Sequence, residues 1–377
     1  MSVNEKNGWY TGLLTLILGI EILMQYSIVF ANISNQYGGT INSIVCTILV
    51  VAYCINIIQN GKLKLDNIIL IILFLVILLI IQKNQILGLF IFCIAFLNVT
   101  PITTIYIYRN GIFISYIINM VLAIVTHHLY NTEGDTIALG FGNQNTAAFF
   151  LAFLVILFLI KKDMTGNLFL KVNWRTSILL IFTLIIVYFL FGDMTATILI
   201  VSFFIFQYII PWLTVRVHKV ILLFLIVFPV FLTYSTYWLA MNYGNSLWIM
   251  KLNTLLSGRL NIWNYYFIRM PIKLISNNRI FVVSAWGNDY TPHQGLFDGS
   301  YAYMLYIIGL LFTIIYVLGL VICNYRLLKY KKYLLLSLIL SLELVGFSEN
   351  QMFSYAYSFT SIFALLSFHR SWIRKRS

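Results

Sequence analysis

The stretch IILIILFLVILLII, residues 68–81, is an unbroken apolar run. Extended to residues 66–82, it is long enough to cross a bilayer as a helix, since a transmembrane helix needs about 17–25 apolar residues. Comparable runs recur on both sides of it, at 9–30, 40–59, 84–100, 111–129, 144–160, 176–192, 194–213, 218–240, 300–323, 333–348 and 352–369. The sequence therefore predicts an all-α, polytopic integral membrane protein with about twelve transmembrane helices.

The composition supports the same class. The 377 residues are 61% hydrophobic and 9% charged, whereas soluble domains carry about 25% charged residues. The first apolar run is too long for the apolar region of a signal peptide, so we interpret it as a span. The cysteines lie inside apolar runs or at the end of one and form no CxxC pair, so we expect no disulfide framework and no metal site. We expect one membrane domain over residues 1–377.

The basic residues predict the orientation. Cytoplasmic loops of membrane proteins are enriched in Lys and Arg. With both termini inside, eighteen of the 24 basic residues fall on the inner side: Lys6, Lys62, Lys64, Arg109, Lys161, Lys162, Lys171, Arg175, Arg216, Lys219, Arg326, Lys329, Lys331, Lys332, Arg370, Arg374, Lys375 and Arg376. The net charge of +13 is thus explained by orientation and lipid headgroups, and no nucleic acid is expected.

One long polar segment, residues 241–299, is predicted to lie on the outer side against this rule. Its basic residues are Lys251, Arg259, Arg269, Lys273 and Arg279. Positive charge at this place suggests an anionic ligand, and arginine is the preferred fork for phosphate oxygens. The alternative is a solvated face near the headgroups. On an ideal helix Arg259, Arg269 and Lys273 would share one sector of about 80°, but Pro271 would break that helix.

Two further outer features carry candidate residues. PHQGLFDGSY, residues 292–301, places His293 and Asp298 at a membrane mouth, where an acid or base can work. The alternatives are an inert histidine and an N-capping Asp. GFGNQN, residues 140–145, opens a helix after an outer loop that contains the pair His127–His128. The amide side chains of this stretch could bind sugar hydroxyls, or the N-terminus of the helix could bind an anion. The alternative is that Asn145 only caps the helix.

Two acids, Glu21 and Glu343, fall within predicted spans. Ionisable groups in the membrane cost about 2.5–3.5 kcal/mol on insertion scales, so each is a functional candidate. The alternative is that both are neutral or hydrogen-bonded to neighbouring Tyr and Asn side chains.

Together these features resemble the Wzy-type polysaccharide repeat-unit polymerases, which are relatives of the O-antigen ligases. Beyond the many spans and the late outer segment, GFGNQNT (140–146) resembles the family's GFGNPN stretch, with Gln144 in place of Pro. SGRLNIW (257–263) resembles S/T-G-R…W, and DGSY (298–301) with Gly309 and Leu310 resembles D/H-N-x-Y…G-L. Two departures stand out: the turn GDMT (192–195) lacks the family's arginine, and Asp298 stands where ligases have histidine.

The resemblance implies a metal-independent glycosyltransferase without a cofactor. It would polymerise polyprenyl-diphosphate-linked oligosaccharides into surface polysaccharide at the outer face of the cytoplasmic membrane. It implies membrane lipids, a flippase and a chain-length regulator as candidate partners. The implied roles are diphosphate binding by Arg259, Arg269, Lys273 and Arg279, catalysis by Arg259, Asp298 and His293, and substrate binding by Asn143, Asn145, Trp263 and Tyr301.

Different functions remain open from the residues alone. A flippase of lipid-linked sugar would predict repeated halves and basic residues at the midplane, and neither pattern is found. A membrane acyltransferase would want a histidine-centred motif, for which His127–His128 is the candidate. A ligase and a non-enzymatic membrane scaffold also remain open.

Overall fold

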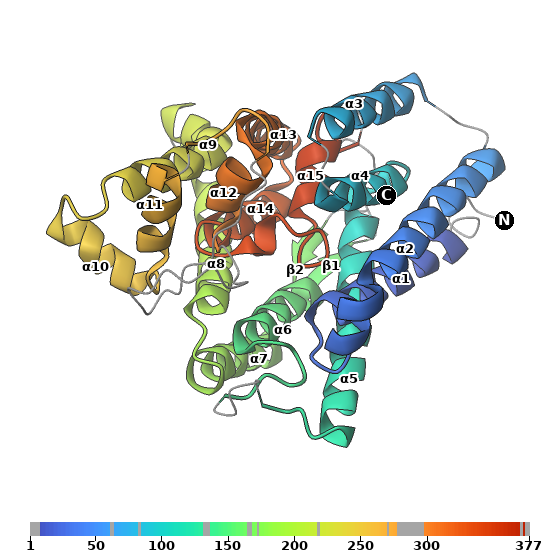
Figure 1. Cartoon of the computed structure of the whole chain (residues 1–377), viewed down its shortest axis with the longest axis horizontal. Helices are drawn as coiled ribbons and strands as arrows, with labels where there is room; N and C mark the ends of the chain where they lie inside the picture. Colours follow the sequence, from blue (N-terminus) through green and yellow to red (C-terminus); the bar gives the residue numbers. More distant parts are fainter. Residues whose placement is uncertain are drawn as a thin grey trace.

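The computed structural model describes residues 8–60, 64–81, 84–130, 136–163, 168–171, 173–216, 219–269, 271–276, 298–369 and 372–373. These residues are mostly helical (Figure 1). The elements are α1 (Gly8–Tyr26), α2 (Ala31–Asn60), α3 (Leu65–Ile81), α4 (Asn84–Phe96), α5 (Pro101–Val125), α6 (Gln144–Leu159), β1 (Ile160–Lys162), β2 (Leu168–Leu170), α7 (Trp174–Ile185), η1 (Ile186–Leu190), α8 (Met194–Arg216), α9 (Lys219–Met241), α10 (Leu247–Leu255), α11 (Arg259–Arg269), α12 (Ser300–Tyr303), η2 (Met304–Ile308), α13 (Leu310–Lys329), α14 (Tyr333–Val345), η3 (Asn350–Met352) and α15 (Thr360–Leu366).

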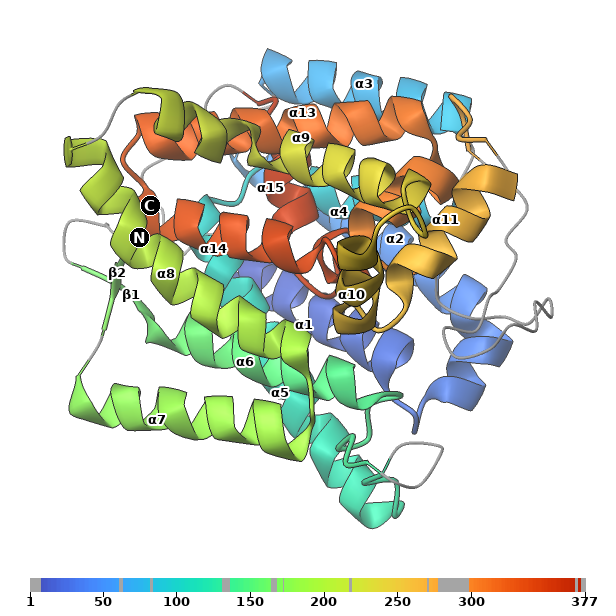
Figure 2. The same cartoon turned by 90° about the vertical axis from the view of Figure 1, so that its left-hand side faces the viewer.

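The chain is a helical membrane protein. Within the described residues, six helices are long and apolar enough to cross a membrane, namely α1, α2, α5, α8, α9 and α13. Shorter apolar helices accompany them, and Figure 2 shows α6, α8, α13 and α14 running alongside one another. The outer surfaces of these helices expose many aliphatic and aromatic residues. A water-soluble protein rarely exposes so large an apolar area. The predicted class is confirmed at this level.

A short hairpin departs from the all-α prediction. Strands β1 and β2 pair antiparallel, with Ile160 opposite Leu170. The predicted span over 144–160 therefore ends as a helix at Leu159. Its last apolar residue continues into the strand, where backbone groups pair across the hairpin instead of along a helix.

The predicted span over 300–323 is wrong, because two segments replace it. α12 and the π-helical η2 end at Gly309, whose φ of 104° favours glycine, and α13 then begins. Residues 271–276 pass close by. Leu310 N donates to the carbonyl of Lys273 (2.9 Å) and Leu311 N to that of Leu274 (3.0 Å). A Cβ on Gly309 would lie 2.7 Å from the backbone of Ile275, so this crossing fixes the break.

The predicted span over 352–369 is also wrong. Turns occupy residues 353–359, and α15 covers only Thr360–Leu366. Hydroxyl groups take up the carbonyls of this segment: Tyr316 donates to Met352 O (3.2 Å) and Ser361 to Phe353 O (2.6 Å). A buried apolar segment can therefore remain irregular, since its backbone groups are satisfied by side chains.

The packing places the C-terminal segment at the centre. α14 contacts α8, α9 and α13, while α15 contacts α4 and α13. α10 and α11, which were predicted only as part of the outer segment 241–299, lie together at one end of the bundle (Figure 2). The start of α8 and the turn after α14 both reach the start of α11, because Thr195 donates to Glu349 and Glu349 pairs with Arg259.

Candidate functional site

Arg259 is the first residue of α11, and a tight turn presents it. Ser257 and Gly258 both have positive φ values, 52° and 83°. This left-handed turn lets Gly258 N donate to the carbonyl of Asn253 (2.9 Å), which closes α10 before α11 begins. The Asn253 side chain then accepts from Asn261 N (3.1 Å). The Ser-Gly pair that precedes the arginine therefore has a local structural reason.

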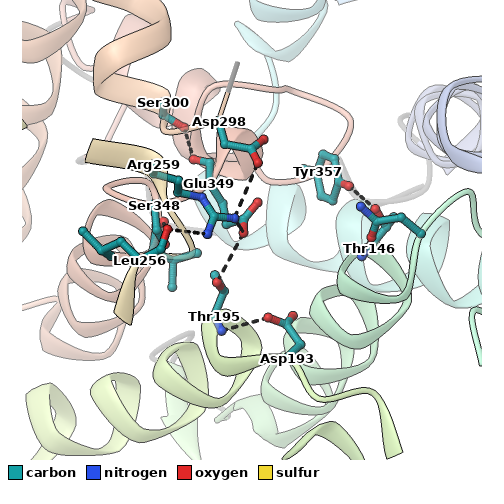
Figure 3. Close-up of polar contacts among 12 residues, drawn as sticks. Thr146, Asp193, Thr195, Leu256, Arg259, Asp298, Ser300, Ser348, Glu349 and Tyr357 are labelled. Atoms are coloured by element: carbon teal, nitrogen blue, oxygen red, sulfur yellow. Dashed lines mark hydrogen bonds and ion pairs between the residues drawn. The ribbon is translucent and has the colours of Figure 1, made fainter. Parts of the chain in front are cut away.

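The guanidinium of Arg259 lies between two carboxylates (Figure 3). Its Nη2 forms an ion pair with Glu349 and lies 3.5 Å from Asp298 Oδ2, while Nη1 donates to the carbonyl of Leu256 (3.1 Å). The Arg259 and Glu349 side chains are only 12% and 9% exposed, whereas that of Asp298 is 34% exposed. Of the two carboxylates, that of Asp298 is therefore the more accessible to a ligand.

Asp298 is held by its backbone. Its carbonyl accepts a hydrogen bond from Trp263 Nε1 (2.7 Å). Gly299 follows with a φ of 95°, and a Cβ there would lie 2.6 Å from the Trp263 ring. Trp263 and Tyr301 are fully buried, and the Tyr301 hydroxyl donates to the carbonyl of Glu343 (3.3 Å). Both predicted substrate-binding aromatics therefore support the site from the interior in this structure.

Glu349 links the entry of α12 to the turn before α8. Its carbonyl accepts from Ser300 N (3.0 Å) and Ser300 Oγ (2.7 Å). The Thr195 hydroxyl donates to Glu349 Oε1 (3.4 Å), and Thr195 N donates to Asp193 Oδ1 (2.8 Å). Asp193 is only 3% exposed. We call the whole set the Arg259 cluster: Asp193, Thr195, Arg259, Asp298 and Glu349.

The charges of the Arg259 cluster do not balance. Two carboxylates contact one guanidinium, a third, that of Asp193, is linked to them through Thr195, and all three acids lie in turns between helices. Burial raises the pKa of Asp193 to about 6. Burial is also the main cause that raises the pKa of Asp298 and of Glu349, against the lowering effect of Arg259. Such a cluster can take up and release a proton near neutral pH, as acid–base catalysis requires.

Two buried polar atoms of the cluster have no hydrogen-bond partner among the described residues: Arg259 Nε and Asp193 Oδ2. Buried polar groups are normally paired. Arg259 Nε can therefore still donate one hydrogen bond, and Asp193 Oδ2 can still accept one, to a group outside the cluster.

Sequence reasoning missed Glu349 and Asp193. Each is the acid in a short polar break between two apolar runs, Gly192-Asp193 and Glu349-Asn350-Gln351. That position is the signal that could have found them, but the same pattern is typical of any connecting turn.

The GFGNQN stretch forms a cap, and the expected capping residue was wrong. Asn143 caps α6, its side chain accepting from Thr146 N (3.0 Å), while Asn145 lies inside the helix. The turn depends on Gly140, whose φ is 81° and whose Cβ would lie 2.6 Å from Ala123 Cβ. Thr146 pairs with the Tyr357 hydroxyl beside the Arg259 cluster (Figure 3). This stretch therefore approaches the same region.

The other predicted cations are only partly placed. Arg269 is the last residue of α11 and Lys273 lies beyond Pro271, outside the helix, so the three cations share no helical face, in keeping with the break expected at Pro271. Lys273 is exposed in the extended segment after the helix. Arg279 and His293 lie outside the described residues.

The two intramembrane acids are paired with uncharged groups. Glu21 accepts from Gln25 Nε2 (2.5 Å) and the Tyr355 hydroxyl (3.3 Å). Glu343 accepts from Asn324 Nδ2 (3.0 Å). Within the part of the chain that the structure describes, neither forms an ion pair.

An apolar pocket of about 710 Å³ lies between α9, α11, η2 and α13. Its walls include Tyr234, Phe267, Pro271, Leu305 and Val317. Because α11 carries Arg259 at its start and Phe267 near its end, the pocket and the Arg259 cluster flank the same short helix.

Comparison with known proteins gives no relative. No protein-family model, no curated protein and no solved structure matches this chain. Over the described residues, no three His, Cys, Asp or Glu side chains are placed to hold a metal ion.

Proposed function

We propose that this protein is a membrane glycosyltransferase that polymerises polyprenyl-diphosphate-linked oligosaccharide repeat units into surface polysaccharide. The observation that carries the proposal is the convergence of Arg259 and Asp298, 39 residues apart, in one buried polar cluster beside the GFGNQNT stretch. Three sequence features that resemble polymerase motifs are thereby gathered at one place.

The cluster contains the groups that this reaction needs. An acceptor hydroxyl gives its proton to a carboxylate as its oxygen bonds to the anomeric carbon of the donor sugar. The bond from that carbon to the diphosphate breaks, and the diphosphate leaves with the electron pair. Asp298 is the accessible carboxylate. Positive charge stabilises the leaving group, and Arg259 with Arg269, Lys273 and Arg279 would supply it.

The apolar pocket supports a lipid-linked substrate. Its lining is almost entirely aliphatic and aromatic, and it flanks the helix that begins with Arg259. A polyprenyl chain in this pocket would anchor the donor while its diphosphate reaches the cations of the adjoining segment.

The proposal includes the topology. Both termini would be cytoplasmic, residues 241–299 would face outward, and about twelve apolar segments would enter the cytoplasmic membrane. In a cysteine-free background, Lys251→Cys in α10 should react with an impermeant maleimide on intact cells. Lys171→Cys should not react until the cells are opened; both positions are exposed. Reversed labelling would contradict the orientation.

The decisive test of function is deletion of the gene. Single, unpolymerised repeat units should accumulate on lipid at the outer face, and the wild-type gene should restore long polymer. Loss of one preorganised contact costs about 10²–10³ in rate, so Arg259→Ala should abolish long polymer. Arg259→Lys should restore little, because a point charge does not replace a fork. Arg175→Ala, at an exposed arginine on α7, is the matched control.

Asp298 has two possible roles that one pair of variants separates. An amide can still accept a hydrogen bond but is a very poor base. If Asp298 is the base, Asp298→Asn should be nearly as inactive as Asp298→Ala; if it only anchors the substrate, Asp298→Asn should be close to wild type. Wild-type polymer from Asp298→Ala would exclude both roles and leave His293 as the remaining candidate in this segment.

A flippase is the second candidate, because Asp193, a buried carboxylate whose pKa burial raises to about 6, also suits proton-coupled transport. Its loss would trap repeat units on the inner leaflet, where an impermeant reagent cannot reach their sugars. A ligase would differ again: its loss would leave finished polymer on the lipid diphosphate.

A further inference from the structure

Glu349 contacts the same guanidinium nitrogen as Asp298 but lies deeper. Arg259 Nη2 faces both carboxylates, and the Glu349 side chain is 9% exposed against 34% for Asp298. Asp298 is therefore the more accessible carboxylate for a sugar hydroxyl, whereas Glu349 is held between Arg259 and Thr195 (Figure 3).

We propose that Glu349 is a positioning residue that shares the charge of Arg259 with Asp298 and so keeps Asp298 basic enough to take a proton from the acceptor hydroxyl. This inference rests on the proposed glycosyl transfer. Without Glu349, the full positive charge of Arg259 would act on Asp298 and favour its ionised, weakly basic form. With Glu349 in place, that charge is shared between two carboxylates.

The backbone fixes this arrangement. Ser300, two residues after Asp298, donates from both its amide and its hydroxyl to the carbonyl of Glu349. The entry of α12 and the turn after α14 are thus tied together, which sets the two carboxylates on the same side of Arg259.

Four charged or titratable groups face Glu349 from the elements around it. Arg259 comes from α11, Asp298 from the segment before α12, Asp193 from the turn before α8, and Tyr357 from the turns before α15. Arg259 is the one cation of this set. Removal of the Glu349 charge therefore changes the field at Asp298 in a known direction: it lowers the pKa of Asp298.

The proton balance is simple. Asp298 takes the hydroxyl proton while the new glycosidic bond forms and the diphosphate leaves, and Asp298 later releases this proton to water. Glu349 exchanges no proton with the substrate. It acts only through Arg259, so its removal should alter how the rate depends on pH and not merely how much protein folds.

The experiment uses full-length protein purified in detergent and lipid-linked repeat units extracted from cells that lack the gene. Polymer formation is measured between about pH 5 and pH 9, where carboxylates with raised pKa values titrate. In Glu349→Gln the acidic limb of the rate profile should move to lower pH by about one unit or more, the range expected for a neighbouring charge. The plateau should also fall, because Asp298 becomes a weaker base.

Two comparisons sharpen the result. Glu349→Asp keeps the charge and should restore the wild-type limb at least partly. Asp66→Asn, at an exposed acid in the first turn of α3, should leave the limb unmoved. An unmoved limb in Glu349→Gln would overturn the inference, as would an equal shift in Asp66→Asn.

The outcomes distinguish this inference from the function on which it rests. If Arg259→Ala and Asp298→Ala both polymerise like wild type, the proposed catalytic site is wrong. If those two are inactive while Glu349→Gln keeps the wild-type limb, only the role of Glu349 is wrong. Should Glu349→Gln fail to accumulate, Asp193→Asn removes another negative charge of the cluster and should produce a smaller shift in the same direction. No shift there would equally overturn the inference.

Discussion

Glu349 and Glu343 are both almost completely buried and lie close together in the chain, yet they are paired in opposite ways. Glu349 contacts a guanidinium and shares it with a second carboxylate. Glu343 accepts hydrogen bonds from the amide of Asn324 and contacts no cation among the described residues. The first region holds several charged groups together, whereas the second pairs a single acid with an uncharged amide inside the helix bundle.

This contrast indicates which region to test for function. Burying charges costs several kcal/mol per ion, and a buried ion pair recovers this only with excellent geometry. An excess of acids over cations, as in the Arg259 cluster, is a poor way to stabilise a fold. A single acid bonded to an amide avoids that cost. The comparison therefore makes the Arg259 cluster, and not Glu343, the first region to test for chemistry.

The largest effect should come from Arg259→Ala. Removal of the cation leaves the acids of the cluster buried without compensation, and breaking a buried pair costs about 3–5 kcal/mol. Thermal unfolding in detergent should register this loss, while Arg175→Ala should stay within about 0.5 kcal/mol, as surface substitutions do. Equal melting temperatures for the two variants would remove the distinction between the cluster and an ordinary surface arginine.

The next effect should come from Gly299→Ala. The added Cβ would lie 2.6 Å from the Trp263 ring and 3.1 Å from the carbonyl of Phe347, at a φ of 95°. Strain of this kind costs about 1–3 kcal/mol and should displace Asp298 from Arg259. Gly192→Ala is the control, because its φ is also positive but nothing lies within 4 Å. Both variants place a Cβ at a positive φ, but only the one at Gly299 meets neighbouring atoms, so similar destabilisation would contradict the packing argument.

A smaller effect, and one that depends on pH, should come from Asp193→Asn. Burial raises the pKa of Asp193 from 3.8 to about 6. The stability that its protonated form contributes is fully present below the unfolded pKa and is lost as pH rises through the folded one. Wild-type protein should therefore lose melting temperature between pH 3.8 and pH 6 relative to Asp193→Asn. Parallel curves for the two proteins would show that Asp193 does not titrate as described.

The smallest effect should come from Glu343→Gln. The amide oxygen of glutamine can accept the same hydrogen bond from Asn324, so the change should be at most the net value of one hydrogen bond, about 0.5–1.5 kcal/mol. Polymer length should be unchanged. A loss of polymer at normal protein level would place Glu343 in the chemistry after all and erase the contrast with Glu349.

The sequence predicted the membrane class and two members of the cluster for clear reasons. Long apolar runs are nearly sufficient to predict a helical membrane protein, because the bilayer permits few alternatives. Arg259 and Asp298 were found because each breaks a local pattern: Arg259 is a cation on the side predicted to face outward, and Asp298 is an acid at a helix entry. Their ion pair was not predictable from either pattern.

What the sequence did not reveal depends on contacts between distant segments. Residues 352–369 are apolar enough to predict a span, but the hydroxyls of Tyr316 and Ser361 bind the carbonyls of Met352 and Phe353 at its start, and residues 353–359 form turns. Gly309 divides a predicted span only because residues 271–276 cross beside it. Glu349 could be recognised as a site residue only from its contact with Arg259, which lies 90 residues earlier in the chain.

That separation has a consequence for how the protein is made. The ribosome delivers Arg259 first, Asp298 after 39 further residues and Glu349 after 90. At about 5–20 residues per second, the arginine waits for several seconds before its second counter-charge exists. During this interval the guanidinium lacks its Glu349 partner, although α11 already has α9 to pack against. The ion pair between Arg259 and Glu349 can thus form only after the segment that follows α14 has been translated.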